Sequence, residues 1–267
     1  MNTNKLTYVQ VLFDRPIPVQ DISTIRKSFY DIKGDEIQKI VSIVDLLKLG
    51  EFSIKSELLK IMMESSDKQI RNLCCRLYCC VAQHSDIPLL ESYVMKIITQ
   101  GDDDELKSFI TSSQYSLSPE VVPLLLALLD DWEDTEIEER IRSVLDELFP
   151  VIDFFDEDVS IDDIRQVFVN LFDEIDGDVY YHGGLPVFPG IWTKELLERA
   201  IEAKNQKSAL YMTNIPTLLS LWIGKDCPTY FDTLIDDKKI NELFEYIKTI
   251  AMMNWEKGSK YFFGHKI

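Results

Sequence analysis

A repeat of helix-like segments, spaced by 32 residues, limits this chain to a small set of folds. Aligned units begin at Ile54, Asp86 and Ser118, and each has an apolar segment, an Asp-rich or polar turn and a second amphipathic segment. The second segment of the first unit shows the i, i+3, i+4 and i+7 spacing of a buried helix face. This face consists of Ile70, Leu73, Cys74, Leu77 and Val81. Periods of 20–50 residues built from helix pairs are typical of α-solenoids.

The repeat predicts a mainly all-α protein whose residues 1–172 form a HEAT-like α-solenoid of helix pairs. The units lie near residues 54–85, 86–117 and 118–149. The Asp-Lys-Gln-Ile-Arg run at 67–71 resembles the start of the second helix in HEAT-type repeats. An irregular helical bundle with coincidental spacing is the alternative, because only one unit carries this run.

Local signals predict where several helices begin and end. Ser118 is followed by proline at the first helical position, and Thr135 forms a capping box with Glu138. Pro150 ends the latter helix, and Ser160 opens another. At the N-terminus, the β-prone residues 5–13 predict a possible short strand.

The last third of the chain has a different composition. Fourteen of the 29 aromatic residues lie between Tyr180 and Phe263. This composition predicts that residues 173–267 form a helical, aromatic-rich C-terminal subdomain or cap, which would cover an exposed end of the repeats. The helices expected within it span residues 194–206, 216–223 and 238–255. Residues 180–186 read as a loop with turn chemistry, and residues 257–267 form an aromatic and basic tail.

Negative charge is concentrated in residues 101–163, which hold twenty carboxylates against Lys107, Arg140 and Arg142, in a chain of net charge −18. This balance argues against a surface for nucleic acid or anionic lipid, both of which require clustered cations. The natural complement is a basic protein. No segment reads as a signal peptide or membrane span, and paired cysteines within one helix are unlike a disulfide framework. We therefore expect a cytoplasmic protein.

The carboxylates recur at the turns between the helices of successive units, at 102–104 and 130–134. Because such turns stack along one edge of a solenoid, they should form one surface. A solvated helical face is the alternative to partner binding, but the local excess of charge and the enclosed Trp132 favour an interface. The expected partner-binding residues are Asp102, Asp103, Asp104, Asp130, Asp131, Trp132, Glu133, Asp134, Asp156, Glu157 and Asp158.

No catalytic or cofactor-binding motif is evident. Asp173, Asp176 and Asp178 miss the calcium-loop spacing, because Phe172 falls at its first position. One helix cannot direct all four clustered cysteines to a tetrahedral zinc ion. His182-Gly183-Gly184 is faintly similar to the oxyanion loop of hydrolases, but the chain has no Gly-x-Ser-x-Gly nucleophile elbow. We therefore expect a protein that is not an enzyme and that uses neither metal nor cofactor.

Three short segments carry a resemblance to a known family. They are the Tyr180–Pro186 loop, the Trp222-Ile223-Gly224-Lys225 segment and the terminal Lys257-Gly258…Lys260-Tyr261…Gly264-His265-Lys266 run. With them, the acidic helical chain resembles the immunity proteins of bacterial polymorphic toxin systems, and in particular the immunity protein 47 family. The resemblance implies an inhibitor that binds a cognate toxin and blocks it in the producing bacterial cell.

Two functions follow as hypotheses. The first is an immunity protein that neutralises a cognate, basic toxin domain through the acidic turns, since electrostatic steering speeds the capture of a basic partner. The alternative is a HEAT-like scaffold or adaptor for a basic protein or peptide client.

Overall fold

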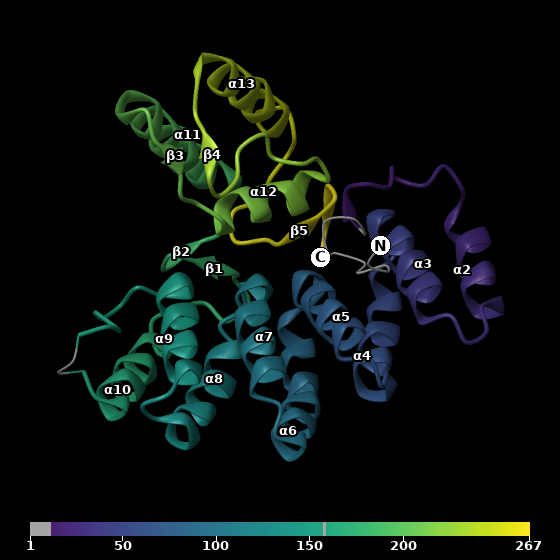
Figure 1. The fold of residues 1–267 in the computed structure, drawn as a ribbon, viewed down its shortest axis with the longest axis horizontal. Coiled ribbons are helices and arrows are strands. Elements are labelled where there is room, and N and C mark those ends of the chain that lie inside the picture. Colours follow the sequence, from purple (N-terminus) through teal and green to yellow (C-terminus); the bar gives the residue numbers. More distant parts are fainter. Residues whose placement is uncertain (1–11, 157–158) are drawn as a thin grey trace, which may run out of the picture.

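The computed structural model describes residues 12–156 and 159–267, which form a mainly helical protein (Figure 1). The prediction of an all-α class is confirmed. The short strand predicted at residues 5–13 lies almost wholly outside the described residues, apart from Leu12 and Phe13, which are not in a strand.

The helices before the C-terminal third are α2 (Ile22–Asp31), α3 (Glu36–Lys48), α4 (Lys55–Glu64), α5 (Lys68–Val81), α6 (Glu91–Gln100), α7 (Asp103–Ser113), α8 (Val121–Leu129), α9 (Glu136–Leu148) and α10 (Ile161–Phe172). Short 3-10 turns are η1 (Phe52–Ile54), η2 (His84–Leu90), η3 (Gln114–Ser116) and η4 (Asp130–Trp132).

Three helix pairs occupy the positions of the sequence repeat. They are α4 with α5, α6 with α7 and α8 with α9, and the second helices α5, α7 and α9 contact one another in succession (Figure 1). The N-caps of these second helices are Asp67, Asp102 and Thr135, which are 35 and 33 residues apart. Each cap side chain accepts backbone N–H groups that the first helical turn leaves unpaired. The helix-pair arrangement agrees with the repeat, and the HEAT-like assignment stays a prediction.

A buried ion pair joins the first two units. The Arg71 Nε and Nη2 atoms donate to the two Glu105 carboxylate oxygens at 2.7 and 2.5 Å, and the Tyr93 hydroxyl donates to Glu105 Oε1 at 2.7 Å. Glu105 is fully buried. Burial alone would raise the Glu105 pKa, but the hydrogen bonds from Arg71 and Tyr93 outweigh it and lower that pKa. Glu105 is therefore a charged group whose partners come from α5 and α6.

The predicted helix starts are confirmed in part. Thr135 caps α9, but the Glu138 carboxylate accepts the Asp134 N–H, so the predicted capping box with Thr135 is absent. Pro119 lies in a turn, and α8 begins two residues later, at Val121.

Ser160 accepts the Asp163 N–H and the Asp163 carboxylate accepts the Ser160 N–H, so that a capping box opens α10. The loop before α10 is held by Arg142, which donates to the carbonyl oxygens of Phe154 and Val159. This cation therefore has a structural role within the acidic stretch.

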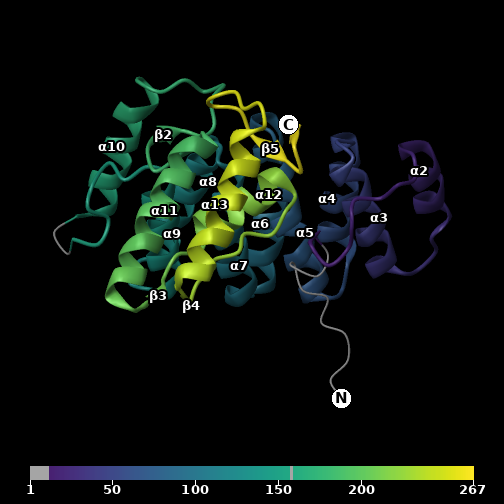
Figure 2. The ribbon, with the colours of Figure 1, turned by 90° about the horizontal axis from the view of Figure 1, so that it is seen from above.

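The C-terminal third combines three helices with short hairpins. Its elements are β1 (Tyr181–His182), β2 (Leu185–Pro186), α11 (Pro189–Gln206), β3 (Ala209–Leu210), α12 (Asn214–Ile223), β4 (Thr233–Leu234), α13 (Asp237–Ala251), β5 (Tyr261–Phe262) and β6 (His265–Lys266). Helix α11 begins at Pro189, five residues before the prediction, because proline suits the first helical turn. Helix α13 ends at Ala251 rather than Trp255. Helices α11 and α13 lie side by side above the stack (Figure 2).

The C-terminal hairpin β5–β6 joins this region to the repeats. Lys260 directly precedes β5, and its Nζ atom donates to the backbone oxygens of Cys79, Ala82 and Ser116 at 2.8, 3.1 and 3.0 Å. These oxygens lie at the ends of α5 and η3, where carbonyl groups lack helical partners. Residues 173–267 are thus bonded to the stack, and their treatment as a separate subdomain remains a proposal.

Gly224 sits where the hairpin packs against the end of α12. It has φ of +69°, and a Cβ atom added to it would lie 2.5 Å from Phe263 Cδ1. We expect Gly224→Ala to lower the free energy of unfolding by about 2 kcal/mol, because left-handed backbone strain adds to the clash. Thermal denaturation measures this loss. Gly177→Ala is the control, since open space surrounds Gly177, and an equal loss in both variants would contradict the packing argument.

Candidate functional site

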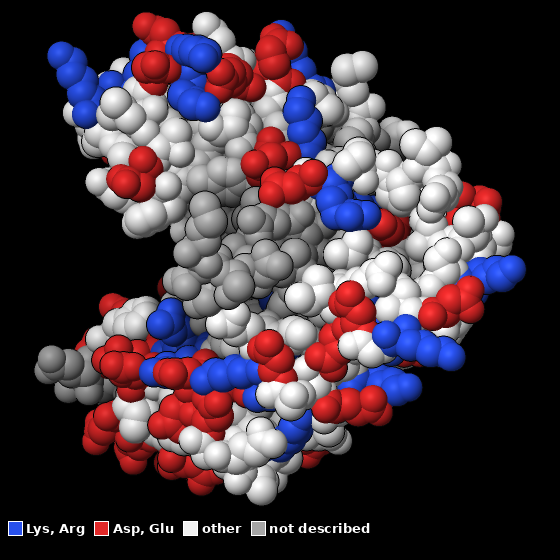
Figure 3. Space-filling model, turned by 45° about the vertical axis from the view of Figure 1, so that its right-hand side comes forward, with Lys and Arg blue, Asp and Glu red and all other residues white. Residues whose placement is uncertain are grey.

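The acidic residues expected to bind a partner lie in two neighbouring inter-helix turns. Asp102, Asp103 and Asp104 begin α7, and Asp130 to Asp134 connect α8 with α9. We call the carboxylates of Asp102, Asp103, Asp104, Asp130, Asp131, Glu133 and Asp134 the acidic edge. Figure 3 shows acidic side chains gathered over the lower part of the molecule, with cations among them.

Part of the acidic edge is neutralised within the chain. Lys68 bonds Asp102 at 2.5 Å, which lowers the Asp102 pKa, and Lys107 lies 3.5 Å from Asp104. Arg165 of α10 pairs with Asp130 at 2.6 Å. These pairs fix the positions of neighbouring helices and reduce the net charge that a partner would meet.

Four carboxylates of the acidic edge have no ion-pair partner among the described residues. Asp103, Asp131, Glu133 and Asp134 are exposed and make no ion pair within that part of the chain. Asp134 adopts φ of 59°, and its backbone N–H donates to Glu138 at 2.6 Å. The Glu138 carboxylate therefore holds this left-handed turn, and the exposed Asp134 side chain is not needed for it.

The other expected site residues differ in their surroundings. Trp132 is only partly exposed and packs against the hydrophobic core, and its buried indole N–H has no acceptor among the described residues. Asp156 is exposed. Glu157 and Asp158 lie outside the described residues. Whether Trp132 acts as an interface anchor stays a prediction.

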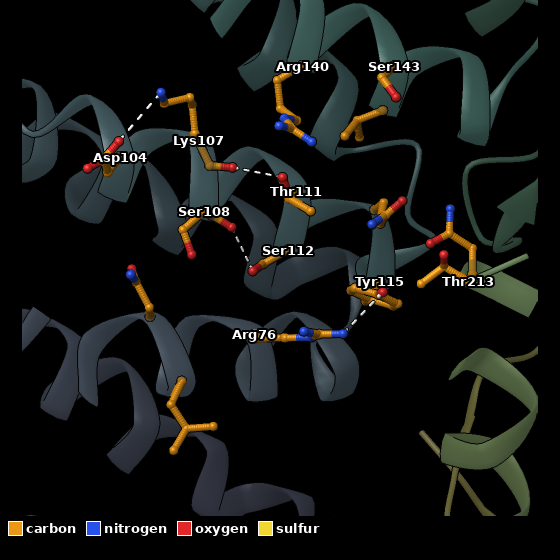
Figure 4. Close-up of a pocket in the computed structure, with 15 residues that line it drawn as sticks. Arg76, Asp104, Lys107, Ser108, Thr111, Ser112, Tyr115, Arg140, Ser143 and Thr213 are labelled. Carbon is orange, nitrogen blue, oxygen red and sulfur yellow. Dashed lines mark hydrogen bonds and ion pairs between the residues drawn. The ribbon is translucent and has the colours of Figure 1, made fainter. Parts of the chain in front are cut away.

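A polar groove runs along the second helices, beside the acidic edge. Its volume is about 740 Å³, and its walls come from α5, α7 and α9, with the start of α12 at one end (Figure 4). We call it the α7 groove. Its charged lining residues are Arg76, Asp104, Lys107 and Arg140. The groove thus carries excess positive charge in an acidic protein.

Sequence reasoning missed the α7 groove because Lys107 and Arg140 appeared only as minor counterions within an acidic run. The spacing of these residues along their helices could have indicated the groove. Lys107 and Thr111 are four residues apart, as are Arg140 and Val144, so each pair shares a helix face. All four residues line the groove.

His84 and His182 have structural partners, and the cysteines are buried. His84 Nδ1 lies 2.8 Å from the Ser118 hydroxyl and its ring stacks on Tyr180, while His182 Nε2 lies 2.9 Å from Glu147. The five cysteines are buried thiols. Within residues 12–156 and 159–267, no three His, Cys, Asp or Glu side chains converge as metal ligands. In the same residues, no helix combines the length and apolar character needed to cross a bilayer.

Comparison with known proteins gives one match. The family model described as immunity protein 47 matches residues 9–267, nearly the whole chain. No curated protein and no solved structure matches the chain. The match covers the repeats and the C-terminal hairpins together.

Proposed function

Because the chain belongs to the immunity protein 47 family, we propose that it binds a cognate bacterial toxin and inhibits it in the cell that produces both. Inhibition takes place by protein–protein contact rather than by chemistry on the toxin. The family match carries this proposal, and the charge distribution supports it.

The acidic edge is the proposed contact for a basic surface of the toxin. Four of its carboxylates, those of Asp103, Asp131, Glu133 and Asp134, are exposed and lack ion-pair partners among the described residues. They sit on turns whose caps and ion pairs fix the backbone. Rigid, unpaired charge attracts a complementary surface over long range and requires little ordering on binding.

We expect a variant that neutralises these four carboxylates to bind the toxin at least tenfold more weakly at low salt. The variant is Asp103→Asn, Asp131→Asn, Glu133→Gln and Asp134→Asn. It leaves the Asp102 cap and the Lys107 pairs intact, so the fold should persist. Surface plasmon resonance against the cognate toxin should show the loss mainly in the association rate, because exposed charges act by steering.

A matched control removes the same amount of charge elsewhere. It carries Asp31→Asn, Glu91→Gln, Glu174→Gln and Glu195→Gln, all at exposed positions. The control should protect toxin-expressing cells as well as the parent does. Equal affinities of the two variants would exclude the acidic edge as the contact. A parent protein that neither binds nor protects would overturn the proposed function itself.

A further inference from the structure

The α7 groove is the surface whose charge least fits the rest of the molecule. Arg76, Lys107 and Arg140 line it, and Asp104 is the carboxylate among its lining residues. The whole chain has a net charge of −18. A cationic groove in an acidic protein is a local feature that neither solubility nor the acidic edge explains.

The three cations differ in how they are held. Arg76 lies over the Tyr115 ring at 5.0 Å and donates to its hydroxyl at 3.3 Å. Lys107 is shared between Asp104 at 3.5 Å and Glu136 at 2.9 Å. Arg140 is exposed and makes no hydrogen bond or ion pair with the described residues. Its charge acts on Glu136 of the same helix, whose pKa is lowered by Lys107 first and by Arg140 to a smaller extent. The Arg140 guanidinium points into the space above α7 (Figure 4), where it can accept a carboxylate with two parallel N–H bonds.

Neutral polar side chains add unused hydrogen-bonding capacity. Asn72, Ser108, Gln114 and Ser143 line the groove, and their side chains make no hydrogen bond with other described residues. By contrast, Thr111 and Ser112 donate to backbone oxygens of their own helix. Free amides and hydroxyls beside a guanidinium match the backbone and carboxylates of an extended peptide.

The shape and charge of the α7 groove favour a peptide over a small molecule or a nucleic acid. Small-molecule pockets have mainly apolar walls, whereas Leu73 and Val144 are the aliphatic side chains among these lining residues. A nucleic acid would be repelled by the surrounding negative charge. The groove follows α7 from Asp104 to Ser112, about 12 Å at 1.5 Å per residue, which corresponds to about four residues of extended chain.

Asp104 and Lys107 connect the two surfaces. Asp104 belongs to the acidic edge and also lines the groove, and Lys107 bridges it to Glu136 at the start of α9. A single partner can therefore cover both. We propose that the α7 groove binds an extended acidic segment of the toxin, with Arg140 as the main charge partner. This inference rests on the proposed function and adds that the toxin presents acidic as well as basic contacts.

The direct test uses a fluorescein-labelled hexaglutamate peptide and fluorescence anisotropy with the full chain at low salt. We expect the parent to bind it and Arg140→Glu to weaken binding at least tenfold. Arg199→Glu is the matched control, because Arg199 is an exposed arginine on α11, away from the groove. A hexalysine peptide should bind all three proteins. Absence of hexaglutamate binding, or equal binding by parent and Arg140→Glu, would overturn the proposal.

A second arm measures protection of cells that express the toxin. We expect Arg140→Glu to protect less well than Arg199→Glu. If Arg140→Glu loses the peptide but protects fully, the groove does not contact the toxin and the proposal fails. If the parent itself gives no protection, the proposed function fails, while the peptide measurement still decides whether the groove binds acidic segments.

Discussion

Replacement of Lys260 by methionine is expected to destabilise the protein by about 3 kcal/mol or more. The methionine side chain fills a similar volume but cannot donate to the oxygens of Cys79, Ala82 and Ser116. Lys260 is almost completely buried, so water cannot replace it. Each buried acceptor left unpaired costs about 1–3 kcal/mol. Urea denaturation followed by circular dichroism measures the loss.

The loss of unfolding free energy caused by Lys260→Met should increase with pH, because the pKa of the buried Lys260 is lowered. Burial lowers the pKa of Lys260 from 10.5 to about 7. Between pH 7 and 10 the unfolded chain keeps a proton that the folded protein has released, so the contribution of Lys260 to stability rises with pH. The stability difference between parent and variant should grow by up to about 1.4 kcal/mol per pH unit in this window. Ionisable groups away from Lys260 contribute equally in both proteins and cancel in the difference.

Lys257→Met provides the control for this prediction. Lys257 is exposed and lies three residues before Lys260 in the same segment. Its replacement should leave the unfolding free energy within about 0.5 kcal/mol of the parent at each pH. A Lys260→Met protein that is as stable as Lys257→Met would show that the hairpin does not depend on the buried Lys260 side chain.

The helices that could be predicted from the sequence are those with local signals at both ends. Thr135 and Ser160 cap helices at the predicted residues, and Pro150 follows the predicted stop. Capping requires only residues within one turn of each other, so the signal is complete within a short window. The repeat was visible for the same reason, because each unit repeats its own local pattern.

The hairpins and the burial of the C-terminal run could not be predicted in this way. Lys260 reads locally as one cation in a basic tail, but its acceptors lie 144 to 181 residues earlier in the chain. Strands of two residues are too short for a period-2 pattern. The acidic edge was named from composition, yet its division into paired and unpaired carboxylates depends on Lys68 and Arg165, which come from other helices.

The buried pair at the start of the second helices gives the other large effect. Arg71→Met is expected to cost about 3–5 kcal/mol, because it leaves the buried Glu105 carboxylate without its cation. Tyr93 would remain as a donor, but one hydroxyl cannot offset the desolvation of a full charge. The Glu105 pKa is lowered in the folded protein. The contribution of the Arg71–Glu105 pair to the unfolding free energy is therefore present above the ordinary Glu pKa of 4.5 and is lost as the pH falls through the lowered value. Chemical denaturation of parent and Arg71→Met at pH 7 and pH 4 measures the loss of stability and its dependence on pH.

A double-mutant cycle of Arg71→Met, Glu105→Leu and the double variant separates loss of the pair from loss of packing. Arg71→Met with Glu105→Leu removes both charges, and it should be more stable than Arg71→Met alone, because no unpaired charge stays buried. Lys194→Met serves as the exposed control, since Lys194 and Glu198 are 3.9 Å apart on the surface of α11 and such pairs contribute about 0–1 kcal/mol. If the double variant were less stable than Arg71→Met, Glu105 would stabilise the stack without its arginine. The Asp-Lys-Gln-Ile-Arg run would then matter for its Asp67 cap and its Lys68 pair rather than for Arg71.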